Sequence, residues 1–158
     1  MLLPYFEWLG SLGFSKLMGE SVWLSAMIQA FHLLALAVFA GAVLIVDLRL
    51  MGAGMRERPI AHVAADAAPW LFWSFIALWI TGVPQLMAYA IKEYYSVYFW
   101  IKTDFFILAV LFTWTIRRRV ALAQEGRVAP VWNKLVGFVS IALWSGVAIP
   151  ARLIGLLS

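Results

Sequence analysis

The chain has 158 residues, of which 65% are hydrophobic and 13% charged, whereas soluble domains average ~45–50% apolar and ~25% charged residues. This composition excludes a soluble globular domain and predicts one membrane domain over residues 1–158; the lack of cysteine excludes disulfides, thiolate metal sites and cysteine nucleophiles. The net charge of +4 does not indicate nucleic-acid binding, because the basic residues fall in short segments between apolar stretches, where they set membrane orientation.

The N-terminal segment is apolar but does not have the pattern of a signal peptide. It lacks a basic start, and Pro4 and Glu7 interrupt what should be a continuous apolar core. The segment combines apolar residues with Trp8 and Lys16, which suits a short helix that lies in the membrane interface: Phe6, Leu9, Leu12 and Phe14. We therefore predict a short interfacial helix over residues 3–18.

Four apolar stretches follow, and each is long enough to cross a bilayer, which takes ~20 residues in a helix. They cover residues 22–46, 68–91, 97–116 and 133–157. A turn rich in Gly and Pro separates the first two, with residues 60–68 as an interfacial lead-in to the second. The short connections favour antiparallel neighbours, so the predicted fold class is all-α, an integral membrane four-helix bundle.

Lys and Arg are distributed unequally between the two sides of this bundle. The first and third connections and their flanks carry eight of them, namely Arg49, Arg56, Arg58, Arg117, Arg118, Arg119, Arg127 and Lys134. The opposite side has Lys16, Lys92, Lys102 and Arg152. Because basic loops stay in the cytoplasm, this asymmetry predicts a multi-pass protein with both termini outside the cytoplasm.

Each predicted span also carries polar residues with helical spacing. In the first span Ser21, Ser25, Gln29 and His32 are separated by 4, 4 and 3 residues, which places them on one helix face. With a rise of ~1.5 Å per residue, His32 lies near the midplane. Polar residues of the other spans lie at a similar depth. One layer in the outer half of the membrane therefore contains His32 and four further residues, and we take this layer as the candidate site: Gln29, Gln85, Lys102 and Arg152.

This layer is suited to haem. A neutral imidazole near the midplane is a common axial ligand of haem iron, so His32 is the candidate ligand of the metal. Lys102 and Arg152 lie nearer the surface, where they would meet the propionates. The second axial position stays open between Met27, Met87 and a five-coordinate iron. Small residues that would let a macrocycle approach the helices are present at Ala35, Ala37, Ala40 and Gly41.

Simpler interpretations of the same residues stay open. His32 is also explained as a packing residue hydrogen-bonded to Gln29 or Ser25, or as part of a proton or substrate path. Lys102 and Arg152 are also explained as side chains that snorkel to the interface. Asp47 and Arg49 end the first helix, where they predict an interhelical salt bridge with Arg117 or Asp66, or else a proton entry or docking point.

Several sequence segments resemble a known family. The segments Phe31-His-Leu-Leu-Ala35, Asp47-Leu-Arg-Leu-Met-Gly52, Phe99-Trp-Ile-Lys102 and Ala151-Arg152 resemble an uncharacterised family of small bacterial integral membrane proteins, defined only as a domain of unknown function. This resemblance implies the bacterial inner (cell) membrane. More distantly, the His-Leu-Leu start and the later Lys and Arg are similar to HemJ-type protoporphyrinogen oxidases and CopD copper-resistance proteins, which implies haem binding.

The sequence therefore leads to one main expectation and two alternatives. The main expectation is a protein that holds b-type haem in the outer half of the bundle and acts in electron transfer or as a redox subunit. The first alternative is a small transporter or channel in which His32, Gln29, Gln85 and Arg152 line a path. The second is an accessory subunit that packs small-residue faces with Gly137, Ser140 and Gly146 against partner helices, in a homo-oligomer or a larger membrane complex.

An enzyme is neither predicted nor excluded. The chain has no Gly-x-Ser-x-Gly, no His-Glu-x-x-His and no phosphate-binding glycine loop. Any enzymatic chemistry would therefore come from a cofactor.

Overall fold

The computed structural model describes residues 2–123 and 126–157, with the side chains of 155–157 excepted. It confirms the predicted all-α membrane bundle, and two short helices rather than one precede the first long one. The elements in chain order are α1 (Leu3–Ser11), α2 (Gly13–Glu20), α3 (Val22–Leu50), α4 (Ile60–Ala88), α5 (Ala90–Tyr95), α6 (Val97–Phe112), the π-helix η1 (Thr113–Arg117), α7 (Arg118–Ala121) and α8 (Pro130–Leu157).

Among the residues that the structure describes, four helical stretches are long and apolar enough to cross a membrane: Val22–Leu50, Ile60–Ala88, Val97–Ala121 and Pro130–Ile154. Most of their side chains lie on the outside of the bundle, where large apolar residues such as Trp23 and Ile80 are exposed. A soluble protein would bury these residues, so the outside of this bundle contacts lipid. The protein is a multi-pass membrane protein.

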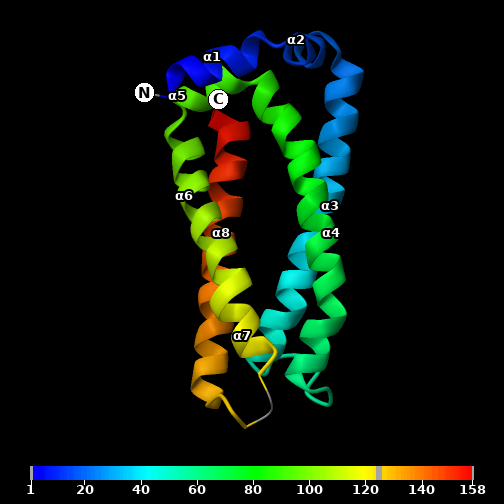
Figure 1. Cartoon of the computed structure of the whole chain (residues 1–158), viewed down its shortest axis with the longest axis vertical. Helices are drawn as coiled ribbons and strands as arrows, with labels where there is room; N and C mark the ends of the chain where they lie inside the picture. The colour runs from blue at the N-terminus through cyan, green and yellow to red at the C-terminus, as the bar shows by residue number, and fades with distance from the viewer. Residues whose placement is uncertain (1, 124–125, 158) are drawn as a thin grey trace.

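The helix ends differ from the sequence prediction at two places. The helix that contains the second span begins at Ile60, directly after Pro59, so the expected lead-in over residues 60–68 is part of the same continuous helix. The expected N-terminal helix over 3–18 is broken at Leu12, whose ψ of 141° is extended. This break divides the segment into α1 and α2, which lie across the end of the bundle (Figure 1).

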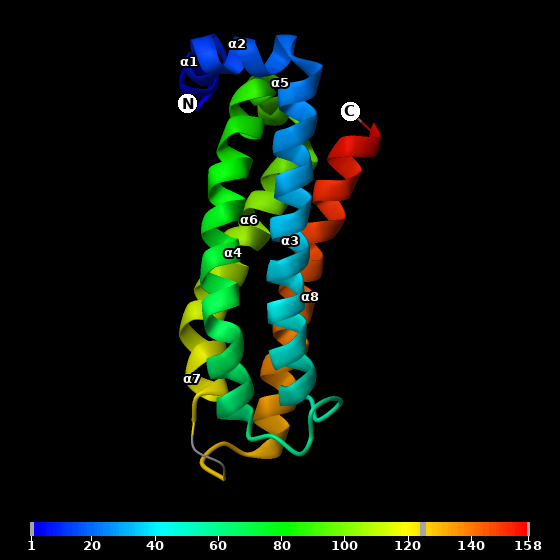
Figure 2. The ribbon, with the colours of Figure 1, turned by 90° about the vertical axis from the view of Figure 1, so that its right-hand side faces the viewer.

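The four long helices form two pairs, α3 with α4 and α6 with α8 (Figures 1 and 2). The short helices α1, α2 and α5 cover one end, near which the C-terminus also lies; we call this the cap end. The other end, where residues 51–59 join α3 to α4, is called the loop end. The pairs approach each other closely at the loop end and stand apart toward the cap end in the view of Figure 1.

An apolar core and a layer of aromatic rings hold the two pairs together. The loop-end core consists of Val46, Leu50, Val63, Ala121 and Val136, all buried. Farther toward the middle, Phe39 of α3 packs edge-on against Trp144 of α8 with ring centroids 4.6 Å apart. Phe75 of α4 contacts Trp114 of η1 at 4.7 Å. Burial of such large rings stabilises the contact between the pairs.

A buried ion pair also joins the two pairs near the loop end. Arg117 Nε donates to Asp47 Oδ1 at 2.6 Å, and Arg117 Nη2 donates to the carbonyl oxygen of Val43 at 2.9 Å. The side chains are only 5% and 0% exposed, and the buried hydroxyl of Ser140 lies beside the same carboxylate. The interhelical bridge between Asp47 and Arg117 that the sequence predicted is therefore confirmed, whereas Asp66 pairs with Arg58.

The π-helix η1 explains how Arg117 reaches the interior. Four residues at intervals of four are buried along this stretch: Ala109, Thr113, Arg117 and Ala121. In a regular α-helix, three steps of four residues rotate the side chain by about 120° away from its starting direction. A π-turn contains more residues per turn and offsets part of this rotation. The π-turn thereby keeps the buried stripe directed at α3 and α8.

The helices α3 and α8 approach each other closely at Gly137. A Cβ atom added there would lie 2.8 Å from the carbonyl oxygen of Asp47 and 3.0 Å from Met51 Cγ. Gly137 and Ser140 are buried, and a Cβ atom at Gly146 would collide with the ring of Phe105. The expectation that these small residues form a face for partner helices is wrong, because they pack inside the bundle.

We expect Gly137→Ala to destabilise the protein by about 1–3 kcal/mol, because the added methyl group collides with backbone atoms that have little room to move. The matched control is Gly41→Ala in α3, where an added Cβ meets nothing within 4 Å. Thermal unfolding in detergent, followed by circular dichroism, measures the difference. An equal midpoint in both variants would contradict the close approach of α3 and α8.

We expect Arg117→Leu to destabilise the protein by about 3–5 kcal/mol, because it leaves the Asp47 carboxylate buried without its cation. Replacement of both partners, Asp47→Leu with Arg117→Leu, should recover most of the loss, since no buried charge then remains. Arg118→Gln, an exposed neighbour, is the control and should change little. The same unfolding measurement applies, and a single variant as stable as the control would refute the role of the pair.

Candidate functional site

His32 lies in α3 and faces α4 in the half of the molecule nearest the cap end. Its side chain is half-buried, and its Nδ1 lies 2.8 Å from the hydroxyl oxygen of Thr81. The ring sits against Gly82, where an added Cβ would lie 3.3 Å from His32 Cε1. The sequence Thr81-Gly82 therefore supplies both a polar partner and the space that the imidazole needs.

The contacts of Thr81 indicate which ring nitrogen of His32 carries the proton. The Thr81 hydroxyl has one hydrogen, and the hydroxyl oxygen donates it to the carbonyl oxygen of Ala77, 2.7 Å away and one turn earlier in α4. This back-bond is the usual one for Thr within a helix. With its hydrogen used there, Thr81 accepts from His32 Nδ1–H. His32 Nε2 is then the nitrogen with the free lone pair.

Lys102 of α6 is half-buried and lies close enough to His32 for their charges to interact. It also interacts with Glu93 of α5, which lies outside the four spans. Burial raises the pKa of Glu93, while Lys102 and Lys92 act in the opposite direction. Glu93 Oε2 is buried and has no hydrogen-bond partner among the described residues. Lys102 of α6 thus interacts both with the imidazole on α3 and with the carboxyl group on α5.

The five residues of the predicted layer divide into two groups. Gln85 is half-buried, and its Nε2 donates to the carbonyl oxygen of Thr81 at 3.1 Å, so it belongs to the same turn as the partner of His32. Gln29 and Arg152 are exposed on α3 and α8. The structure therefore brings His32, Lys102 and Gln85 into one neighbourhood, and leaves the side chains of Gln29 and Arg152 exposed.

Sequence reasoning missed Glu93. Glu93 lies in the short segment between two predicted spans, and a helix of six residues such as α5 is too short to show an amphipathic period. The sequence signal for Glu93 is a single carboxylate among aromatic residues at the level of the membrane interface. The role of Thr81 as the partner of His32 was also missed, although its spacing of four from Gln85 was visible.

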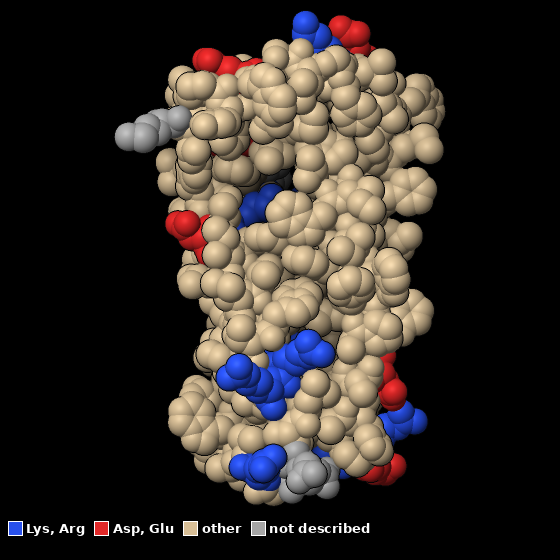
Figure 3. Space-filling model, viewed as in Figure 1, with Lys and Arg blue, Asp and Glu red and all other residues tan. Residues whose placement is uncertain are grey.

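Aromatic rings lie on two sides of the neighbourhood formed by His32, Lys102 and Gln85. Toward the loop end lies the aromatic layer that includes Phe39, Phe75 and Trp144. At the cap end, Phe6 of α1 packs against Tyr94 and Trp100, with centroids 5.2 and 6.2 Å away. On the face shown in Figure 3, a basic side chain lies deep in a hollow between the two helix pairs, in the half nearest the cap end.

Three other residues do not join this neighbourhood, namely the second histidine, His62, and the sequence candidates Asp47 and Arg49. His62 is exposed near the start of α4, at the loop end. Asp47 is engaged by Arg117, and Arg49 Nε donates to the carbonyl oxygen of Arg58 at 2.7 Å. These contacts support the interpretation that Asp47 and Arg49 end α3 and join it to neighbouring segments. Within the described part of the chain, no group of three or more His, Cys, Asp or Glu residues could hold a metal ion.

Comparison with known proteins gives a family but no activity. No curated protein and no solved structure matches the chain, so the similarity to HemJ-type and CopD proteins stays an expectation. A family model described as "Family of unknown function (DUF6644)" matches residues 5–157. The chain belongs to this family of unknown function, as the resemblance of its sequence segments predicted.

Proposed function

We propose that the protein binds b-type haem between its two helix pairs near the cap end, with His32 as an axial ligand, and serves in electron transfer or as a redox subunit. The observation that carries this proposal is the hydrogen bond between His32 Nδ1 and Thr81. Histidines that bind metals through one ring nitrogen usually donate the other N–H to a fixed acceptor. Thr81 is such an acceptor, and it directs the lone pair of Nε2 away from α4.

The protein offers one imidazole as a metal ligand, which fits a cofactor that itself supplies most of the ligands of its metal. His32 is the single imidazole in this neighbourhood, since His62 lies at the other end of the bundle. A porphyrin supplies four nitrogens to its iron and needs only one or two from the protein. When bound, haem provides one-electron chemistry, while the protein holds and orients it. The aromatic layer beneath would present an apolar surface to the ring.

Two cations are available for the propionates. Lys102 is half-buried close to His32, and a propionate there would replace part of its interaction with Glu93. Arg152 is exposed on α8 and is the candidate partner of the other propionate, at the edge of the bundle. Pairing of this kind lowers the cost of a cation within a membrane span.

The distribution of basic residues supports an orientation for the site. The loop end holds most of the Lys and Arg residues, with Arg56, Arg58, Arg118 and Arg119 exposed there. By the positive-inside rule we infer that the loop end faces the cytoplasm and that both termini lie outside it. The haem would then lie in the outer half of the bacterial cell membrane.

One observation favours a second candidate function, a proton or small-cation path. Glu93 Oε2 is buried without a hydrogen-bond partner among the described residues, beside Lys102. Ionisable groups within membranes often form proton relays. Because Gln29 and Arg152 are exposed, such a path would run through Glu93, Lys102 and His32. It requires a colourless protein whose proton flux, measured in vesicles, is lost in Glu93→Gln.

We expect the protein purified in detergent, with haem supplied during expression, to show a Soret band that His32→Ala abolishes. The matched control is His62→Ala, which removes the other histidine and should leave the band unchanged. Absorption spectra of the oxidised and reduced forms measure the haem load. A colourless wild type after haem supplementation, or a full load in His32→Ala, would refute the proposal.

Thr81→Val should weaken haem binding by about 10–100-fold, the usual effect of removing the hydrogen-bond acceptor behind a metal-binding histidine. The valine keeps the shape of the side chain but cannot accept from His32 Nδ1–H. Thr103→Val is the control, because Thr103 makes the same type of back-bond, to Phe99, in α6. Haem titration of the apoprotein measures both affinities. Equal affinities would show that Thr81 does not position His32.

A further inference from the structure

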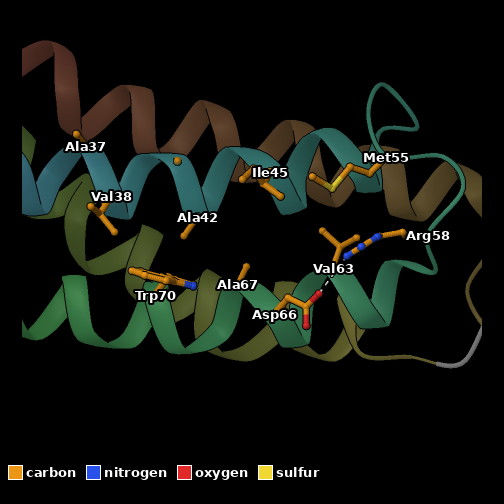
Figure 4. A pocket seen from close by; sticks show the side chains of 11 residues that line it. Ala37, Val38, Ala42, Ile45, Met55, Arg58, Val63, Asp66, Ala67 and Trp70 are labelled. Carbon is orange, nitrogen blue, oxygen red and sulfur yellow. Dashed lines mark hydrogen bonds and ion pairs between the residues drawn. The ribbon is translucent and has the colours of Figure 1, made fainter.

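An apolar groove of about 420 Å³ lies between α3 and α4 in the half nearest the loop end. Its volume falls within the range of small-molecule sites. Figure 4 shows Val38 and Ala42 of α3 opposite Ala67 and Trp70 of α4. Val38 and Trp70 are exposed, as is Ile45 farther along, so the groove opens toward the lipid.

Small residues create the groove. Gly41, Ala42 and Ala67 line it, and an added Cβ at Gly41 would meet nothing within 4 Å. A small residue that no neighbour approaches leaves a furrow on the surface of a helix pair. Along α3 the furrow runs from Ala37 to Ile45, which is about 12 Å at the usual helical rise. An extended hydrocarbon chain fits a furrow of this shape.

The end of the groove nearest the loop carries one cation and one anion. Arg58 Nη1 lies 3.5 Å from Asp66 Oδ2, and the two side chains are 67% and 70% exposed. Figure 4 shows this pair beside Val63 and Met55, where the groove meets the loop. An exposed ion pair of this length contributes little to stability. Both groups can therefore exchange their partner for a charged ligand at small cost.

The loop fixes the place of Arg58. Arg49 Nε donates to the carbonyl oxygen of Arg58 at 2.7 Å, and Arg56 Nε donates to that of Gly52 at 2.6 Å. Gly52 and Met55 have positive φ angles of 77° and 49°, which shape the turn. The backbone at Arg58 is thus held by the Arg49 side chain and by its own N–H, which donates to the carbonyl oxygen of Met55 at 3.0 Å.

We propose that this groove binds a phospholipid with a primary-amine zwitterionic headgroup, phosphatidylethanolamine. Its acyl chain would lie along Gly41 and Ala42, its phosphate against Arg58 and its ammonium group against Asp66. This headgroup carries one negative and one positive charge, which are complementary to Arg58 and Asp66 at the end of the groove. Phosphatidylcholine carries the same charges, but its quaternary amine has no N–H to donate to a carboxylate. Phosphatidylglycerol lacks the positive charge altogether.

Native mass spectrometry of the detergent-purified protein tests this assignment with dioleoyl phosphatidylethanolamine, phosphatidylcholine and phosphatidylglycerol as separate probes. We expect phosphatidylethanolamine to bind about tenfold more tightly than phosphatidylcholine, the effect of one charge-assisted hydrogen bond. Asp66→Asn should abolish this preference, and Glu57→Gln, an exposed carboxylate outside the groove, should keep it. Equal binding of the first two lipids, or a preference that survives Asp66→Asn, would overturn the proposal.

A second pair of variants tests the groove itself. Gly41→Leu fills the furrow without touching another residue through its Cβ, whereas Ala40→Leu adds a similar side chain at an exposed position outside it. We expect only Gly41→Leu to lower lipid binding, with thermal unfolding midpoints equal in both variants. Unchanged binding in Gly41→Leu would overturn the proposal. So would a wild-type dimer that Gly41→Leu converts to monomer without a change in bound lipid, since the groove would then join two copies.

Discussion

The buried ion pair between Asp47 and Arg117 is the constraint on which the arrangement of the helices depends. A membrane interior offers no water to either charge, so each must find its partners inside the protein. Asp47 finds the guanidinium at 2.6 Å, and the guanidinium also reaches the Val43 carbonyl. Because these contacts join α3 to η1, they fix the two helix pairs relative to each other near the loop end. The π-turn at Thr113–Arg117 brings the arginine into this position.

The rest of the bundle follows from the tight junction at the loop end. Gly137 lets α8 approach the backbone of α3 beside Asp47, and the core around Val46 and Leu50 fills the remaining space. Toward the cap end, beyond the aromatic layer, the pairs stand apart (Figure 1), and the half-buried side chains of His32, Lys102 and Gln85 lie in this half of the molecule. Stability and the candidate site are therefore placed at opposite ends. Substitutions at the site need not disturb the junction, and this separation makes His32 and Lys102 suitable for mutational tests.

The sequence predicted the class of fold because hydropathy alone identifies helices that must cross a bilayer. The pairing of Asp47 with Arg117 was also predictable, since a charge near the end of a span requires a partner. The layer of site residues was predicted less well. Helical rise gives the depth of a residue, but its direction around the helix depends on where neighbouring helices pack. Gln29, three residues before His32, therefore proved exposed, and so did Arg152. Glu93 was missed because a six-residue helix such as α5 is too short to show a period.

The turn of α4 that contacts His32 contains two residues that weaken a helix, Gly82 and Pro84. Other side chains of the same turn stabilise it. Gly82 contributes flexibility, and Pro84 has no N–H to donate to the carbonyl of Ile80. Thr81 donates to the carbonyl oxygen of Ala77 at 2.7 Å, and Gln85 donates to that of Thr81 at 3.1 Å. These two bonds hold the turn in helical form while Gly82 leaves room for the imidazole. The Thr81 hydroxyl therefore stabilises the helix and also orients His32. A neutral residue stands here in the position that a carboxylate occupies behind many metal-binding histidines.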